Sequence, residues 1–210
     1  MRLSNRIFAS WLVASALAWG QSPQVSEHPS ALVRVSFTSL ILGDSGSYRQ
    51  ICFSFDRTGR YELRRVTMKV STERTQGSAV YDKVVSGPPH TELVRGFMFA
   101  SESEKLEKLL ADSDFLKFTT STPKMTALQR GAEDFVAEVP REKGVQRVVM
   151  RDADGENPFP RSVQEIVNWL QDFKAENAKP LDVSADICPR DALSDALSGH
   201  GFISLYGPTR

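Results

Sequence analysis

The segment of this chain with the clearest chemical potential is Gly43-Asp44-Ser45-Gly46. A serine hydroxyl on a sharp turn can act as a nucleophile if a histidine takes its proton and an acid orients that histidine. His28 is the only histidine before Ser45, and no acidic residue stands between His28 and Asp44. The composition also suits a tight turn between two strands, which is the interpretation we favour.

The same tetrapeptide is similar to the nucleophile motifs of two hydrolase groups. Chymotrypsin-like proteases carry Gly-Asp-Ser-Gly, and SGNH hydrolases carry Gly-Asp-Ser after their first strand. The SGNH pattern also needs a Gly-x-Asn-Asp block, absent here, and a late Asp-x-x-His, whereas Asp195 and His200 are five residues apart. A cryptic serine hydrolase using Ser45 is therefore the alternative functional hypothesis.

Two other groups of residues could carry chemistry. The oxygen-rich loop Asp152–Asn157 fails the spacing of a calcium-binding EF-hand, because Gly155 comes too early and no Glu stands at the twelfth position. We interpret this loop as a turn before the next helix. The three histidines match no zinc spacing: His28, His90 and His200. We expect no metal site and no cofactor.

Basic residues gather on one predicted hairpin region: Arg57, Arg60, Arg64, Arg65, Lys69 and Arg74. Arg60, Arg64 and Arg65 are the candidates for binding an anionic ligand or glycan. A solvated sheet face with cross-strand acidic partners explains the same pattern, and we favour that interpretation.

The first twenty residues have the three parts of a secretory signal peptide. Arg2 and Arg6 give a basic start, Ile7–Ala18 is apolar, and small residues follow. The apolar run is too short to cross a bilayer of about 30 Å as a helix. We therefore expect an exported protein, periplasmic or secreted, with no transmembrane segment after signal removal and a disordered spacer over 21–30.

The expected mature chain has 24 basic and 26 acidic residues, a net charge of −2. This balance gives no long-range attraction to nucleic acid or anionic lipid. We expect no nucleic-acid partner. The expected partner is an unknown protein or another component of the cell envelope.

Cys52 and Cys188 are the two cysteines of the chain. Alternation over Ile51–Phe55 places Cys52 on the sheet face opposite to Ile51 and Phe53. A C-terminal tail crossing that face would bring Cys188 to it, and an even cysteine count in an exported protein indicates a disulfide. The bond would close a loop of about 135 residues, worth at most about 5 kcal/mol. The alternative is two free thiols in a reducing compartment.

Periodicity predicts an α+β domain over residues 31–176 and a tail over 177–210. The expected antiparallel sheet has about five to seven strands with two helices, in the order β-β-β-β(β)-α-β-β-α. A change of parity near Arg64-Arg65 predicts a β-bulge there. Capping boxes at Ser101/Glu104 and Ser162/Glu165 predict the helix starts. The expected strands cover 31–42, 48–56, 61–70, 78–85, 93–99, 134–139 and 145–152.

The sequence resembles a group of uncharacterised exported bacterial α+β domains over about residues 48–176. The resemblance rests on Tyr61-Glu62-Leu63, Leu106-x-x-Leu109-Leu110, Asp114-Phe115-Leu116, Val148-Val149 and the helix between Pro160 and Phe173. Of that group's usual cysteine pair near the second strand, only Cys52 is present. The group has no assigned activity, so the resemblance implies no functional residue. The sequence favours a non-enzymatic binding or interaction domain at the bacterial cell envelope.

Overall fold

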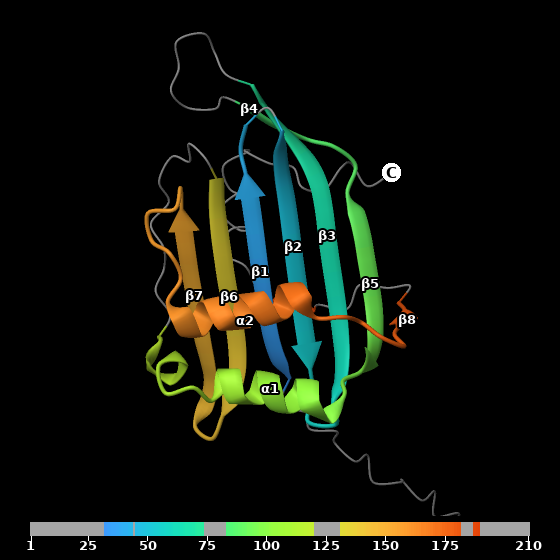
Figure 1. Cartoon of the computed structure of the whole chain (residues 1–210), viewed down its shortest axis with the longest axis vertical. Coiled ribbons are helices and arrows are strands. Elements are labelled where there is room, and N and C mark those ends of the chain that lie inside the picture. Colours follow the sequence, from blue (N-terminus) through green and yellow to red (C-terminus); the bar gives the residue numbers. More distant parts are fainter. Residues whose placement is uncertain (1–31, 44, 74–82, 120–130, 182–186, 190–210) are drawn as a thin grey trace, which may run out of the picture.

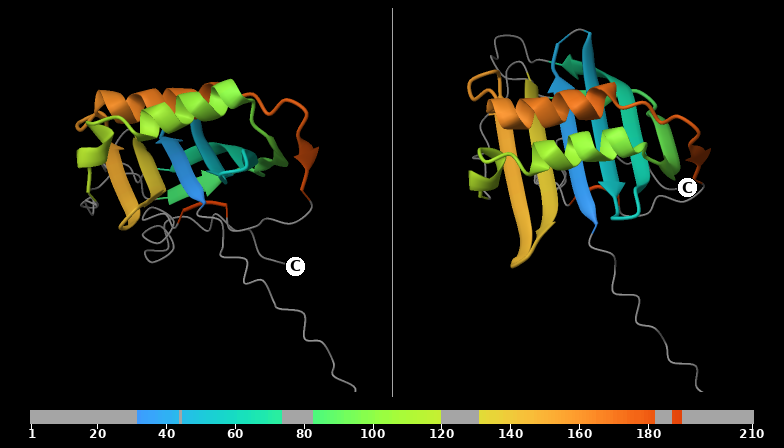
Figure 2. Two further views of the ribbon diagram at one scale, coloured as in Figure 1. Left: turned by 90° about the horizontal axis from the view of Figure 1, so that it is seen from below. Right: turned by 60° about the horizontal axis from the view of Figure 1, so that its bottom comes forward.

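The computed structural model describes residues 32–43, 45–73, 83–119, 131–181 and 187–189. The predicted signal peptide (1–20) and spacer (21–30) lie outside these residues. In the described part, an eight-stranded antiparallel sheet carries two α-helices on one face (Figures 1 and 2). This arrangement agrees with the predicted α+β class.

The strands follow the order β7-β6-β1-β2-β3-β5-β8 across the sheet, and the short β4 pairs with β3. The elements are β1 (Val33–Ile41), β2 (Gly46–Phe55), β3 (Arg60–Glu73), β4 (Lys83–Ser86), β5 (His90–Phe97), α1 (Ala100–Leu110), the 3-10 helix η1 (Phe115–Lys117), β6 (Gly131–Arg141), β7 (Gly144–Ala153), α2 (Arg161–Asp172) and β8 (Lys179–Pro180).

The predicted element order needs a correction at its end. The chain returns to the sheet after α2, where β8 pairs with Val94 and Arg95 of β5. This strand lies within the segment that the sequence assigned to a tail. A strand of two residues, one of them a proline, has no periodicity from which it could be detected.

The predicted bulge in β3 is wrong. β2 and β3 pair in one continuous register from Phe55↔Tyr61 to Gly46↔Val70. The parity changes because the sheet is buried on different faces at its two ends. Tyr61 and Leu63 face the helices, whereas the other half of β3 contributes to a second cluster on the opposite face. That cluster contains Leu40, Tyr48, Val66, Met68 and Val70.

The main core lies between the helices and the sheet. The Phe53 ring lies edge-on to Trp169 and Phe173 of the α2 segment, with centroids 5.2 and 5.0 Å apart, and stacks on Tyr61. Such aromatic pairs contribute about 0.5–1.5 kcal/mol each beyond their area burial. The Trp169 Nε1–H also donates to Glu102 of α1 at 2.9 Å, which joins the two helices.

Neither predicted capping box forms. The N-cap residues are Phe99 and Pro160, and neither helix has a side-chain cap. Ser162 instead lies inside the first turn of α2, where its buried hydroxyl has no hydrogen-bond partner in the described part of the chain. Pro160 has φ near −54°, which already suits entry into a helix.

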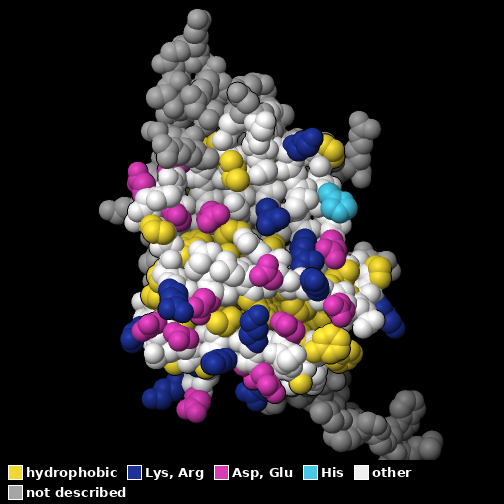
Figure 3. All heavy atoms as spheres, viewed as in Figure 1, with side chains coloured by type: hydrophobic (Ala, Val, Ile, Leu, Met, Phe, Trp, Pro, Cys, Tyr) yellow, Lys and Arg dark blue, Asp and Glu magenta, His cyan; other side chains and the backbone are white. Residues whose placement is uncertain are grey.

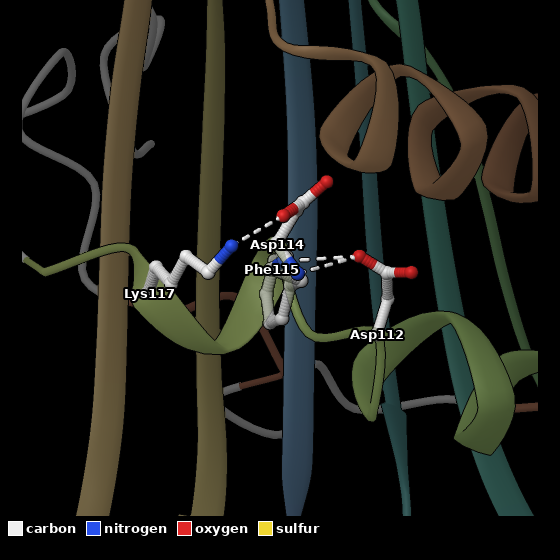
Figure 4. Close-up of polar contacts among 4 residues, drawn as sticks. All are labelled: Asp112, Asp114, Phe115 and Lys117. Atoms are coloured by element: carbon white, nitrogen blue, oxygen red, sulfur yellow. Dashed lines mark hydrogen bonds and ion pairs between the residues drawn. The ribbon is translucent and has the colours of Figure 1, made fainter.

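Aspartates organise the end of α1 and the start of η1 (Figure 4). The Asp112 carboxylate accepts hydrogen bonds from the backbone N–H groups of Asp114 and Phe115 at 2.8 and 3.2 Å. Lys117 pairs with Asp114 at 2.7 Å. These contacts turn the chain so that the Phe115 side chain is fully buried in the main core.

Gly96 leaves room for the Tyr61 ring. A Cβ atom at position 96 would lie 2.7 Å from the Tyr61 Oη atom and 2.8 Å from its Cζ atom. Burial also raises the pKa of the Tyr61 phenol. The ring is held between Phe53 and Phe173, so it cannot move away without disturbing the core.

We expect Gly96→Ala to lower the free energy of unfolding by about 1–3 kcal/mol, the usual cost of overpacking. Gly87→Ala is the matched control, because a Cβ there would lie 3.6 Å from its nearest neighbour. Urea denaturation followed by tryptophan fluorescence measures both. Equal midpoints for the two variants would contradict this account of Tyr61.

Candidate functional site

The sheet extends beyond its helical cover. β1 has nine residues and is therefore about 30 Å long. Two helices side by side, each about 10 Å wide, cover about 20 Å of that length. Above α2 in Figure 1 the sheet therefore continues without a helix over it.

A row of polar side chains crosses this uncovered part. Glu133, Ser39, Arg49, Thr67 and His90 are consecutive cross-strand neighbours on β6, β1, β2, β3 and β5, and we call them the polar row. Arg49, Thr67 and His90 are exposed. The Ser39 hydroxyl donates to the Glu133 carboxylate at 3.4 Å. Hydrogen-bonding groups from five strands are thus presented along one line.

The row of cross-strand neighbours next to the polar row, on the side of α2, forms the edge of the main core. Phe135, Phe37 and Ile51 are buried there. On β3, the Arg65 guanidinium donates to Glu92 at 3.1 Å and to the backbone carbonyl of Phe173, at the end of α2. Arg65 therefore fastens α2 to the sheet and marks the boundary between the core and the polar row.

The polar row lies in an open hollow of about 830 Å³, which we call the groove. Its margins include Gln171 of α2 on one side and the Gly87-Pro88 segment before β5 on the other. Ile41, which is 54% exposed, adds an apolar contact, and Lys69 adds a second exposed cation beside Arg49. Seen from the helix side, this face of the molecule carries side chains of both charges (Figure 3).

Arg49 and Lys69 are the exposed cations of the groove. Among the described residues, neither Arg49 nor Lys69 forms an ion pair. At the other end of the row, Asp152 of β7 lies next to Glu133. The groove can therefore bind an anionic group at one end and a cationic group at the other.

The Gly43–Gly46 segment is a turn between β1 and β2, as we favoured. The Gly46 N–H donates to the Gly43 carbonyl at 3.2 Å. A side chain at Gly46 would collide with the carbonyl oxygens of Ile41 and Val70, at 2.6 and 2.7 Å. Gly43 has a φ of 138°, which favours glycine, so local backbone geometry explains both glycines. Ser45 is exposed, and Asp44 lies outside the described residues.

The three arginine candidates do not converge on one site. Arg60 is exposed at the start of β3, whereas Arg65 faces α2 and has the structural role described above. Arg64 is the cross-strand neighbour of Cys52 on the opposite face. Arg74 lies outside the described residues.

The oxygen-rich loop uses its carboxylates to shape a turn. Asp152 accepts a hydrogen bond from the Asn157 N–H, and Asp154 accepts one from the Gly131 N–H, both at 3.0 Å. Gly131 has no room for a side chain, because a Cβ there would lie 1.9 Å from the Leu40 carbonyl oxygen. In the described part of the chain, no three metal-ligating side chains gather closely enough to hold an ion.

On the face opposite the helices, the predicted disulfide joins Cys52 to Cys188. Cys52 is fully buried. Ile187, the residue before Cys188, is also buried, with 2% of its surface exposed. A buried ion pair lies on the same face, where Arg151 contacts Asp134 through two bonds of 2.7 Å. Burial raises the pKa of the Asp134 carboxyl despite this partner.

Sequence reasoning missed most of the groove. Arg49, Ser39 and Glu133 were not candidates, because none belongs to a known motif or to the arginine-rich hairpin. A signal exists at alternate positions of the central strands. On β2, the positions facing the helix side change from Phe53 and Ile51 to Arg49 and Ser47.

Comparisons with known proteins add no functional residue: no protein-family model matches the sequence, and no curated protein matches it. None of the helices among the described residues is long and apolar enough to cross a membrane.

We expect the purified protein to contain no free thiol, because Cys52 and Cys188 are joined across a separation of 136 residues. Alkylation without reductant should add no mass, and alkylation after reduction should label both cysteines. Replacing both by Ala should lower the free energy of unfolding by about 2–5 kcal/mol. Two alkylated cysteines in the unreduced protein would contradict the bond.

Proposed function

We propose that this protein is a non-enzymatic binding module of the bacterial cell envelope and that its ligand lies in the groove. The observation that carries the proposal is the polar row, over which the described part of the chain places no helix, whereas α2 covers the neighbouring row. A surface with hydroxyl groups, an exposed Ile41 and two cations that form no ion pair within the described residues suits recognition of a ligand with mixed polarity.

The position of the groove on the sheet supports binding. Its polar groups are attached to paired strands rather than to a loop, so they are held in place before a ligand arrives. Preorganised groups lower the entropy cost of association. By contrast, the row does not favour catalysis. Ser39 and His90 stand three strands apart, and the Ser39 hydroxyl is 3.4 Å from the Glu133 carboxylate, longer than the usual contact between a nucleophile and its base.

The disulfide supports an exported location. Such bonds persist in oxidising compartments, including the periplasm and the medium. We therefore place the binding function outside the cytoplasm, periplasmic or secreted, with a protein or another envelope component as the partner.

Blocking the groove should abolish ligand retention. Thr67→Trp places a large side chain in the polar row between Arg49 and His90, at an exposed strand position that tolerates aromatic residues. Val145→Trp is the matched control, since Val145 is 66% exposed on β7 and outside the groove. The assay applies each protein to arrays of immobilised peptides and bacterial cell-wall glycans.

We expect at least one ligand class to be retained by wild type and by Val145→Trp but lost by Thr67→Trp. The proposal fails if Thr67→Trp retains the same ligands as the control, or if wild type retains nothing. Thermal unfolding of the three proteins shows whether a loss reflects unfolding instead.

The alternative function, a serine hydrolase using Ser45, has a direct test because Ser45 is exposed. We expect a fluorophosphonate probe to label wild type no more than Ser45→Ala, because the turn itself accounts for both glycines of the motif. Labelling that disappears in Ser45→Ala would favour the hydrolase over the binding module.

A further inference from the structure

We propose that the groove binds an extended peptide segment of about six residues, basic at one end and acidic at the other. This inference rests on the proposed function and names the ligand class of the same groove.

The charges of the groove are separated along its length. Glu133 of β6 lies at one end of the groove, and Asp152 of β7 lies next to it, just outside the lining. Arg49 lies on β2 at the centre of the row, and Lys69 and His90 lie on β3 and β5, farther from the acids. The ligand with complementary charge therefore has its cationic group over the acids and its anionic group over Arg49 and Lys69.

The distance between these ends sets the length of the ligand. Glu133 and His90 are four strand steps apart, since the order between them is β6-β1-β2-β3-β5. Neighbouring strands lie about 4.8 Å apart, so the row is about 19 Å long. An extended chain advances about 3.3 Å per residue, so about six residues span the row.

The middle of the groove suits a peptide better than a sugar or a base. Phe37 and Tyr48, the aromatic residues among its described lining, are 1% and 5% exposed, so they offer no stacking platform. Single-stranded nucleic acids depend on such platforms. Ser47, Thr67 and Gln171 instead offer hydrogen bonds to peptide groups, and Ile41 offers an apolar contact.

Two blocked hexapeptides of equal composition test the inference. The first, acetyl-Lys-Lys-Ala-Ala-Glu-Glu-amide, separates its charges as the groove does, and the second, acetyl-Glu-Lys-Ala-Ala-Lys-Glu-amide, does not. By calorimetric titration we expect the first peptide to bind about tenfold more tightly, because several exposed ion pairs add small contributions. Its affinity should fall as salt is added.

Variants locate the acidic end of the peptide. Arg49→Gln with Lys69→Gln should weaken binding of the first peptide by about tenfold. Arg57→Gln with Arg60→Gln is the matched control, because it removes two exposed cations outside the groove lining and should leave the affinity unchanged. Thermal unfolding checks that both double variants fold.

Equal affinities for the two peptides, no binding of either, or an unchanged affinity in the Arg49/Lys69 variant would overturn this inference. If a glycan retained by wild type is lost by Thr67→Trp, the peptide inference fails and the proposed binding function stands. If Thr67→Trp loses no ligand, the proposed function itself fails.

Discussion

The packing of α2 across the central strands decides which part of the sheet becomes core and which part becomes surface. Phe53 meets Trp169 and Phe173 at centroid distances near 5 Å, and Arg65 holds the carbonyl at the end of the helix. These contacts fix the position of α2 along the strands. Since a helix is about 10 Å wide, the sheet beyond it needs residues that tolerate water, and the polar row supplies them.

The opposite face follows a complementary pattern. Where the helix side turns polar, the other side of the same strands carries Leu40, Tyr48 and Met68 in the second cluster. The disulfide lies on this face near the middle of β2 and holds residues 187–189 there. The sheet thus has a core on each face, displaced along the strands, and the groove lies on the helix side opposite the second cluster.

Strand and helix periodicity could be predicted from the sequence because most elements bury one face along most of their length. The Cys52–Cys188 bond could also be predicted, since alternation around Cys52 identified the face that it occupies. The same reasoning gave a wrong prediction for β3, where the expected bulge is absent. A change of parity has two physical causes, a bulge or a change in the buried face, and the sequence of one strand cannot separate them.

The capping boxes failed for a different reason. Ser162 and Glu165 have the required spacing, but the helix begins two residues earlier, because Pro160 takes the N-cap position and its φ suits helix entry. The fixed φ of Pro160 therefore determined the start of α2, and the Ser162/Glu165 motif did not. The groove could not be predicted from any local motif, since its five row residues come from five strands and become neighbours only through the register.

That origin also explains why the groove suits recognition better than catalysis. Groups on adjacent strands are held about 4.8 Å apart, so a row of them can contact well-separated groups of one ligand. A nucleophile and its base need hydrogen-bond contact, below about 3.2 Å, which cross-strand neighbours reach only when long side chains lean together. In the polar row the Ser39 hydroxyl and the Glu133 carboxylate are 3.4 Å apart, which is longer than that contact, and Arg49 and His90 are exposed. A sheet surface of this kind presents its charges in a fixed order, and the ligand that we propose is one whose charges follow the complementary order.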